Sequence, residues 1–208
     1  MLYEIAHILR DKLGFVWDGL ESLNSLLFGL RYRKVLRELP ALLESRTTEL
    51  GKQRREGLPM LTFRLASKED AAAMACFFAR QPEESYTYFR PHGFDEKTIQ
   101  KLIQRTSFLT MLVLDGEKVV GYFFLRSFVH GCGYLGKIVD ADSQGQGIGK
   151  QMCLVAMDVA LSLGIRMFES INYKNEASMR SSSVLKQVIV EELDDGDLLI
   201  EDLPLKNG

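Results

Sequence analysis

The sequence has few of the features that would indicate a disulfide framework, a zinc site or a membrane span. Among its 208 residues the only cysteines are Cys76, Cys132 and Cys153, and no two of them have the spacing of a metal-binding pair. Widely separated cysteines in an odd number are typical of reduced thiols. No apolar run approaches the ~20 residues of a membrane-spanning helix, and the start of the chain lacks a secretory signal pattern. We therefore expect a cytoplasmic protein with no membrane span and no metal.

An excess of charge of one sign is also missing. The chain has 26 Lys and Arg against 28 Asp and Glu, a formal net charge of −2. Such a balance gives no overall attraction to nucleic acid, so we expect no nucleic-acid partner. What the chain does have is length and apolar content. With 46% hydrophobic residues in 208, it can form one domain with a substantial core and an extension.

The first quarter of the chain is predicted to be helical and to lie outside the main domain. Pro40 interrupts a third helical stretch, and the charged, glycine-containing segment 49–59 is typical of a linker. We therefore predict a helical arm and linker over residues 1–59 and the main domain over residues 60–208. Apolar residues recur at helical spacing in the arm: Ile5, Ile8, Leu9, Val16, Leu20, Leu23, Leu27 and Leu30.

The apolar stripe of this arm must be covered by something. Packing within the chain, a homodimer and contact with a partner protein all remain open. A membrane-surface helix is less favoured, because Asp11, Asp18 and Glu21 dilute the basic face that such helices usually show.

From Leu61 onward the pattern alternates between strands and helices. The run Val119–Leu125 is almost continuously apolar and indicates a strand buried on both faces, and Asp115-Gly116 is a hairpin signal. The predicted order is β, α, α, β, β, β, α, β, α, β, β. The predicted strands are 61–65, 108–114, 119–125, 133–139, 165–171, 187–193 and 198–203, and the helices are 68–80, one capped by Asp95, 148–163 and 175–185.

The stretch Ser143–Lys150 places three glycines at alternate positions between a strand and a long amphipathic helix. Such a loop lets backbone N–H groups approach an anion at the start of the helix. A Walker loop is excluded, because Gln144 and Gln151 stand where that loop needs glycine and a hydroxyl residue. A dinucleotide fingerprint is excluded, because Gly149 follows Gly147 by two residues and not three.

What remains, Gln144-x-x-Gly147-x-Gly149, resembles the pyrophosphate loop of the GNAT superfamily of acyl-CoA N-acyltransferases. That loop carries Gln or Arg, two free positions, Gly, one free position, then Gly or Ala. The predicted order of elements over 61–203 resembles the GNAT fold as well. The resemblance implies an α/β (α+β) fold with a mixed, splayed sheet flanked by helices, here preceded by a helical extension. It implies acetyl-CoA as co-substrate, lying between strands 133–139 and 165–171.

The resemblance also implies which residues hold the cofactor. The N–H of Val139, with Ile138 nearby, would polarise the thioester carbonyl. Asn175 would contact the cofactor arm. The pyrophosphate would rest on the loop and the helix start, formed by Gln144, Gly145, Gln146, Gly147, Ile148, Gly149 and Lys150.

The catalytic groups are less well matched by the family pattern. Seven residues after Asn175, where relatives carry a tyrosine that protonates the departing thiolate, the chain has Ser182. An attacking amine also needs a proton acceptor. Strand alternation puts Glu169 on an apolar face with Ile165, Met167 and Ile171, which would raise its pKa; His130, near the strand that enters the cleft, is the other candidate.

Two functions follow from these residues. The first is an N-acetyltransferase that moves an acetyl group from acetyl-CoA to the amine of a small metabolite, such as an amino sugar or amino acid. Its acceptor would contact the segment 81–94, which contains Tyr86, Tyr88, Phe89, Arg90 and His92. The second is a non-catalytic CoA-binding or docking module whose helical arm binds a partner.

Overall fold

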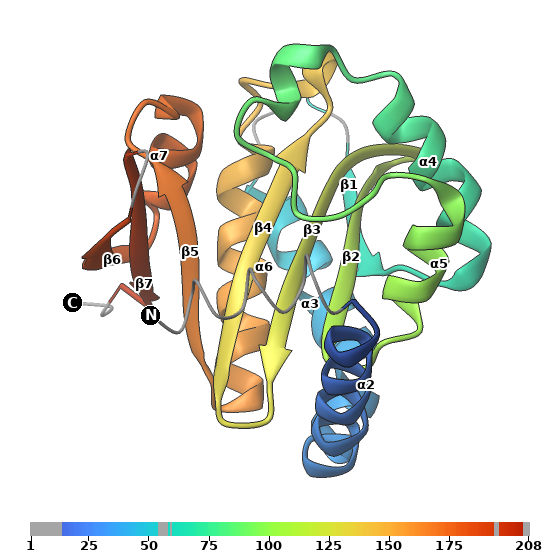
Figure 1. Cartoon of the computed structure of the whole chain (residues 1–208). Helices are drawn as coiled ribbons and strands as arrows, with labels where there is room; N and C mark the ends of the chain where they lie inside the picture. The colour runs from blue at the N-terminus through green and yellow to red at the C-terminus, as the bar shows by residue number, and fades with distance from the viewer. Residues whose placement is uncertain (1–13, 54–57, 59, 194–195, 206–208) are drawn as a thin grey trace.

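The computed structural model describes residues 14–53, 58, 60–193 and 196–205, and these form one open seven-stranded sheet with helices on both faces (Figure 1). The strand order is β1-β2-β3-β4-β5-β7-β6. The strands are β1 Leu61–Leu65, β2 Phe108–Asp115, β3 Lys118–Phe128, β4 Cys132–Val139, β5 Arg166–Asn172, β6 Lys186–Glu192 and β7 Asp197–Leu203. The helices are α2 Gly14–Arg31, α3 Arg33–Gln53, α4 Ala71–Ala79, α5 Glu96–Ile103, α6 Ile148–Leu163 and α7 Glu176–Ser182, with short 3₁₀ turns at Lys68–Asp70, Glu83–Tyr86 and Ala141–Ser143.

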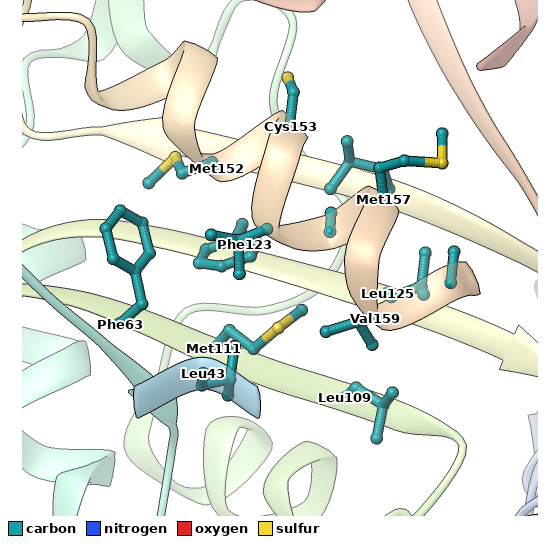
Figure 2. Close-up of a cluster of buried hydrophobic side chains, with 14 of the residues drawn as sticks. Leu43, Phe63, Leu109, Met111, Phe123, Leu125, Met152, Cys153, Met157 and Val159 are labelled. Carbon is teal, nitrogen blue, oxygen red and sulfur yellow. The ribbon is translucent and has the colours of Figure 1, made fainter. Parts of the chain in front are cut away.

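The core lies on both faces of the sheet. On one face α3 and α6 cover β1 to β5, and Figure 2 shows Leu43 of α3, Phe123 of β3 and Val159 of α6 within this layer. On the other face lie α5 and α4, which contributes Phe77 and Phe78, and both helices pack against aromatic rings of β2 and β3. Because β3 is covered on both faces, seven consecutive residues from Val119 to Leu125 are buried. Continuous apolar sequence there follows from this two-sided cover.

The predicted order of strands and helices from Leu61 to Leu203 is confirmed, and so is the fold class. The helix predicted over 148–163 begins and ends where the sequence placed it, since Gly164 takes a left-handed φ of 64° just after its last residue. Asp95 caps α5 by accepting a hydrogen bond from the N–H of Thr98 at 3.0 Å. The final hairpin is also present, although residues 194 and 195 of its turn lie outside the described residues.

The first quarter of the chain differs from its prediction. Pro40 lies inside α3 and does not end it, and α3 continues to Gln53, so residues 49–53 are helical and not part of a linker. Leu39, Leu43 and Leu50 of α3 are buried in the same cluster as the sheet. The rest of the predicted linker falls mostly on residues 54–57 and 59, which lie outside the described residues, as does the helix predicted before Gly14. Residues 33–53 therefore form part of the core of the main domain.

The sheet opens between β4 and β5. These parallel strands pair along Cys132–Tyr134 and Arg166–Phe168, and no further pairing joins them within the described residues. β4 then stays with β3 as far as Val139, while β5 pairs with β7 up to Asn172. The predicted splay is therefore present, and a V-shaped opening faces the end of β4 that leads into the glycine loop. None of the described helices is long and apolar enough to cross a membrane.

Candidate active site

The glycine loop leads directly into the start of α6. Gly145 and Gly147 have φ values of 77° and 79°, a left-handed conformation that L side chains rarely adopt. This conformation turns the chain into α6 at Ile148, and the cap residue Gly147 offers no side chain to the first turn. The first N–H groups of a helix have no partner within the helix. The loop thus presents backbone donors and the positive end of a 16-residue helix dipole at the mouth of the opening.

Two residues of the predicted phosphate cradle have other roles as well. The N–H of Gln144 is donated to the carbonyl of Ala141 at 3.4 Å, so the donors that can face a phosphate begin after Gln144. Gly149 lets α6 approach α7 closely, because a Cβ at Gly149 would lie 3.1 Å from the Cβ of Ser181. The side chain of Lys150 is exposed on the first turn of α6. Gly145, Gln146, Gly147 and Ile148 are the other members of the predicted cradle.

A buried carboxylate anchors the segment before the loop. The side chain of Asp140 is 3% exposed. Its carboxylate pairs with the guanidinium of Arg80 at 3.1 Å and the ammonium of Lys118 at 3.0 Å, and it accepts a hydrogen bond from the side-chain amide of Gln81 at 3.0 Å. Gln81 also accepts the N–H of Ala141 at 3.0 Å, which ties the entry of the loop to the end of α4. Burial raises the pKa of Asp140, but its hydrogen-bond donors outweigh burial and hold the pKa below its usual value.

Replacing Asp140 with asparagine is expected to lower the free energy of unfolding by about 1–2 kcal/mol at pH 7. Arg80 and Lys118 are partly exposed, and solvent screens their share. Because the folded pKa of Asp140 is depressed, its stabilisation is present above the unfolded value of 3.8 and is lost as the pH falls through the folded value. Urea denaturation of both proteins across acid pH should show the difference shrinking. Asp142→Asn, an exposed neighbour, is the control; an equal loss there would contradict this role.

The backbone of β4 offers donors to the opening. Asp140 donates its N–H to Val120 of β3 at 2.9 Å. Because N–H groups alternate in direction along a strand, those of Lys137 and Val139 point away from β3, toward the gap before β5. The N–H of Val139, the predicted donor to the thioester, therefore points into this gap, and its role stays a prediction. The side chain of Ile138 is instead buried in the core on the α4 and α5 face.

A cleft of about 420 Å³ occupies the opening between β4 and β5. Its polar lining comes from the segment after α4, from both splayed strands and from the start of α7. The lining residues are Thr87, Tyr88, Phe89, Arg90, Leu135, Gly136, Lys137, Glu169, Ser170, Asn172, Asn175, Ser178 and Asp197. Asn175 lies in this wall, and its side-chain oxygen caps α7 by accepting the N–H of Ser178 at 3.1 Å.

An ion pair lies at the base of the cleft, where β4 and β5 diverge. Lys137 Nζ donates to Glu169 Oε2 at 2.7 Å and to Ser182 Oγ at 2.8 Å. The side chains of Lys137 and Glu169 are 7% and 3% exposed. The Sγ of Cys153, on α6, lies 3.7 Å from the same Ser182 hydroxyl. Glu169 is thus buried as predicted, but its setting is ionic and not apolar.

A second carboxyl group belongs to this cluster. Asp202 of β7 is 2% exposed, and neither of its carboxylate oxygens has a hydrogen-bond partner among the described residues. Burial, and then the charge of Glu169, raises the pKa of Asp202 to about 8. At neutral pH Asp202 is therefore mostly protonated. The cluster then holds one cation, one carboxylate and one neutral acid.

The other titratable members of the cluster respond to the same burial. Burial lowers the pKa of Lys137, but the carboxylate of Glu169, to which Lys137 donates a hydrogen bond, outweighs burial, so the pKa is raised and Lys137 stays protonated. Burial raises the pKa of the Cys153 thiol. Cys153 is therefore a neutral thiol at pH 7 and not a nucleophile.

The structure brings together only two of the three predicted catalytic residues. Glu169 lines the cleft, whereas Ser182 is fully buried behind it and accepts a hydrogen bond from Lys137. His130 is exposed in the hairpin between β3 and β4, at the opposite end of β4 from the glycine loop, with its ring near Phe128. The fold brings Glu169 and Ser182 together through Lys137, and it does not bring His130 to them.

The segment predicted to meet the acceptor divides in two. Tyr88, Phe89 and Arg90 line the cleft. His92 is instead held within the aromatic core, where its Nε2 lies 2.7 Å from the hydroxyl of Tyr122 and burial lowers its pKa. Tyr86 donates its hydroxyl to the carbonyl of Phe78 and fixes the segment against α4.

Comparison with known proteins agrees with this geometry. The family model described as Acetyltransferase (GNAT) family matches residues 69–181, from the 3₁₀ turn before α4 to α7. The chain belongs to the GNAT acetyltransferase family. The predicted membership is confirmed, and the protein is an acyltransferase enzyme. No curated protein matches the chain by sequence.

Solved structures of GNAT enzymes share the fold of this family member at low identity. RimJ of Mycobacterium smegmatis, in complex with CoA-disulfide, has a TM-score of 0.58 and 13% identity over 70% of this chain and 82% of its own. The ribosomal-protein-S5-alanine acetyltransferase of Vibrio fischeri has a TM-score of 0.58 and 18% identity over 71% and 94%. The putative acetyltransferase yncA of Salmonella typhimurium, with its cofactor acetyl-CoA, has a TM-score of 0.50 and 21% identity over 71% and 95%.

Proposed function

We propose that this GNAT enzyme transfers the acetyl group of acetyl-CoA to the amine of a small polar metabolite such as an amino sugar or an amino acid. The observation that carries the proposal is the cleft where β4 and β5 diverge, with the glycine loop at its mouth and the Lys137–Glu169 pair at its base. The mouth suits a phosphate-bearing donor, and the base suits an amine that has to lose a proton.

The donor would lie along the edge of β4. The N–H groups after Gln144 and the dipole of α6 suit the pyrophosphate, with Lys150 close to it. The N–H groups of β4 that face the gap suit an extended arm, and that of Val139 would donate to the thioester oxygen as negative charge develops there. Asn175 and Ser178, at the start of α7, form the other wall.

The acceptor would enter beside Glu169. An ammonium group gives its proton to Glu169, and the free amine attacks the carbonyl carbon, forming the C–N bond while the C–S bond breaks. The thiolate of CoA takes the second amine proton, directly or through solvent. Ser182 is fully buried, so we assign it to holding Lys137 and not to protonating the thiolate. A thiolate is a tolerable leaving group without a dedicated acid, since thiols have a pKa near ~8.5.

The chemistry of the cleft favours a small polar acceptor. Of its lining, Thr87, Arg90, Ser170 and Asp197 bring hydroxyl, cationic and anionic groups to one open cleft of about 420 Å³. Such a lining matches hydroxyl, carboxyl and amino groups on one compact molecule.

The Gly147→Trp protein is expected to bind acetyl-CoA at least ~30-fold more weakly than the wild type. Tryptophan cannot easily take the left-handed φ of 79° at this position, and its ring would cover the loop donors. Titration calorimetry measures the difference, with Gly116→Ala, another left-handed glycine in the β2–β3 turn, as the control. Wild-type protein that gives no binding heat would refute the donor assignment.

The acceptor class needs a separate assay. Release of free thiol from acetyl-CoA is followed with panels of amino sugars, amino acids, simple amines and short peptides. Turnover confined to small polar amines supports the proposal. Turnover confined to peptides would overturn the acceptor class but leave the donor assignment intact.

A further inference from the structure

Helix α2 carries its apolar face on the outside. Five leucines at helical spacing keep large exposed fractions: Leu20 50%, Leu23 52%, Leu26 61%, Leu27 41% and Leu30 65%. A helix at the surface of a globular protein normally turns its apolar stripe toward the core. A continuous exposed apolar face of this kind marks a surface that contacts something else.

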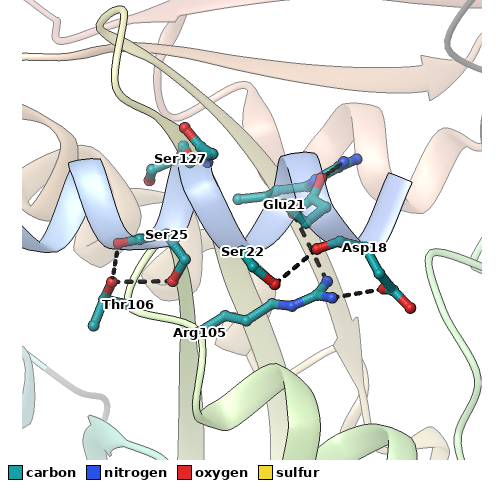
Figure 3. A network of polar contacts seen from close by, with 9 residues as sticks. Asp18, Glu21, Ser22, Ser25, Arg105, Thr106 and Ser127 are labelled. Carbon is teal, nitrogen blue, oxygen red and sulfur yellow. Dashed lines mark hydrogen bonds and ion pairs between the residues drawn. The ribbon is translucent and has the colours of Figure 1, made fainter. Parts of the chain in front are cut away.

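The inner face of α2 is mostly polar, and its contacts fix this orientation. Asn24 donates to the carbonyl of Ser127 at 2.9 Å and accepts the N–H of Val129 at 3.0 Å. Figure 3 shows Ser25 directed at Thr106, within hydrogen-bond distance at 3.1 Å. Phe28 is fully buried, but the rest of this face is held by hydrogen bonds and ion pairs.

The close approach of α2 to the domain strengthens this attachment. A Cβ at Gly29 would lie 2.9 Å from Thr106 Oγ1, so glycine permits the contact. Arg31 donates to the carbonyl of Val129 at 2.9 Å, at the far end of the helix. The leucines therefore face outward because the whole helix is bound through its other side.

The same arrangement pairs two acidic residues of α2 with arginines of the domain. Asp18 pairs with Arg105 at 2.9 Å, and Glu21, 6% exposed, pairs with Arg126 (Figure 3 shows the contacts with Arg105). In sequence these carboxylates argue against a membrane-surface helix. In the structure Glu21 is buried in its ion pair, whereas the side chain of Asp18 stays 67% exposed in its pair with Arg105, and Asp11 lies outside the described residues.

Basic residues lie at the end of the leucine stripe. A surface groove of about 600 Å³ joins α2 to the start of α3, and Leu30 belongs to both the stripe and the groove. The groove is lined by Leu30, Arg31, Arg33, Lys34, Arg37 and Glu38. Among the residues that the structure describes, none forms an ion pair with Arg33, Lys34 or Arg37.

We propose that α2 and the start of α3 form a membrane-contact surface that binds an anionic lipid bilayer, with the leucines in the headgroup region and the groove cations at lipid phosphates. Exposed leucines with adjoining Lys and Arg suit this interface, because apolar burial and attraction to anionic lipid act together. A second copy of the chain would bring the same leucines but also four more cations against its one carboxylate, Glu38, so mostly like charges would face one another.

The proposal goes beyond acetyl transfer. α2 docks beside Ser127 and Val129, at the end of β3, whereas the glycine loop follows the opposite end of β4. The cleft can therefore work on a soluble acceptor whether or not α2 is bound.

Flotation of the full chain with vesicles tests the proposal. We expect binding to vesicles of phosphatidylcholine mixed in equal parts with phosphatidylglycerol, at least about tenfold stronger than to phosphatidylcholine alone and weakened by salt. Leu27→Ser with Leu30→Ser should weaken this binding roughly tenfold or more. Arg33→Glu with Lys34→Glu should weaken it by about as much on the mixed vesicles.

The controls are an exposed leucine and a lysine elsewhere, Leu161→Ser and Lys186→Glu, which should bind like the wild type. Thiol release with a soluble acceptor should be equal in all these proteins, which shows that they fold. Equal binding to both kinds of vesicle, or no effect of the leucine changes, would overturn the proposal. A second result would also overturn it: the wild type binds no vesicles but sediments as a dimer, and the leucine variant sediments as a monomer. A second copy of the chain would then cover the face.

Discussion

Replacing Lys137 with methionine is expected to lower the free energy of unfolding by about 3–5 kcal/mol, the cost of leaving a buried charge without its partner. In the folded protein Glu169 is 3% exposed and Lys137 is its cationic partner, at 2.7 Å. Methionine fills a similar volume but cannot neutralise Glu169. In the variant the carboxylate of Glu169 remains buried, with the neutral Asp202 beside it. Chemical denaturation at pH 7 measures the loss of stability.

A double substitution separates charge from packing. Lys137→Met combined with Glu169→Gln removes both members of the pair, and we expect it to recover most of the lost stability, since replacing a whole buried ion pair is often close to neutral. Lys150→Met, an exposed lysine on α6, is the matched control and should change the free energy of unfolding by less than ~0.5 kcal/mol. If the double variant is no more stable than Lys137→Met, the loss comes from packing, and the charge argument is wrong.

The sequence predicted the fold closely where one local pattern decided each element. The alternating and continuous apolar runs gave the strands, and Gly164 ended α6, because these signals depend on residues that are near one another in the chain. The start of the chain was predicted less well for the opposite reason. Helix α3 packs on β1 and α6 through contacts between separate elements, such as that of Thr47 with Phe63, which a local pattern does not reveal. The charged end of α3, residues 49–53, was therefore predicted to be a linker.

The candidate site shows the same division. The glycine loop and Asn175 are local motifs; Asn175 lines the cleft, and the loop follows the end of β4 at which the sheet opens. Lys137 and Asp202 were missed, because each acts through partners on other strands. A signal was present, since Lys137 lies two residues from the apolar Leu135 and Val139 and so shares their face of the strand, as Asp202 shares the face of Ile200. A charged residue at the buried parity of a strand indicates a partner, but sequence alone does not say which.

The Glu169→Gln protein is expected to lose about 10²–10⁴-fold in kcat for acetyl transfer, the usual contribution of a general base. This expectation rests on the proposed function, in which Glu169 takes the proton of the incoming ammonium. Stability is a separate readout. The Lys137→Met, Glu169→Gln double variant should regain stability and remain slow, so that a slow rate cannot be blamed on unfolding.

Asp202 provides the sharper test, because it is expected to act on pH dependence through Glu169. Asp202 acquires its charge only as the pH rises through about 8, and this negative charge beside Glu169 should change the wild-type kcat/KM in that range. In Asp202→Asn no such charge forms, so this change in kcat/KM near pH ~8 should be absent. Two acceptors with different amine pKa values distinguish this change from titration of the substrate.

The same substitution should alter stability with a definite sign. The folded pKa of Asp202 is raised from 3.8 to about 8, so its contribution to stability is present in full below the unfolded value and is lost as the pH rises through the folded one. Asparagine never acquires the charge. The free energy of unfolding of Asp202→Asn should therefore match that of the wild type below the unfolded value of 3.8 and exceed it by roughly 2 kcal/mol or more above pH ~8. A stability gain without any movement of the rate profile would show that Asp202 only shapes the fold, and that the proton of the acceptor leaves by another route.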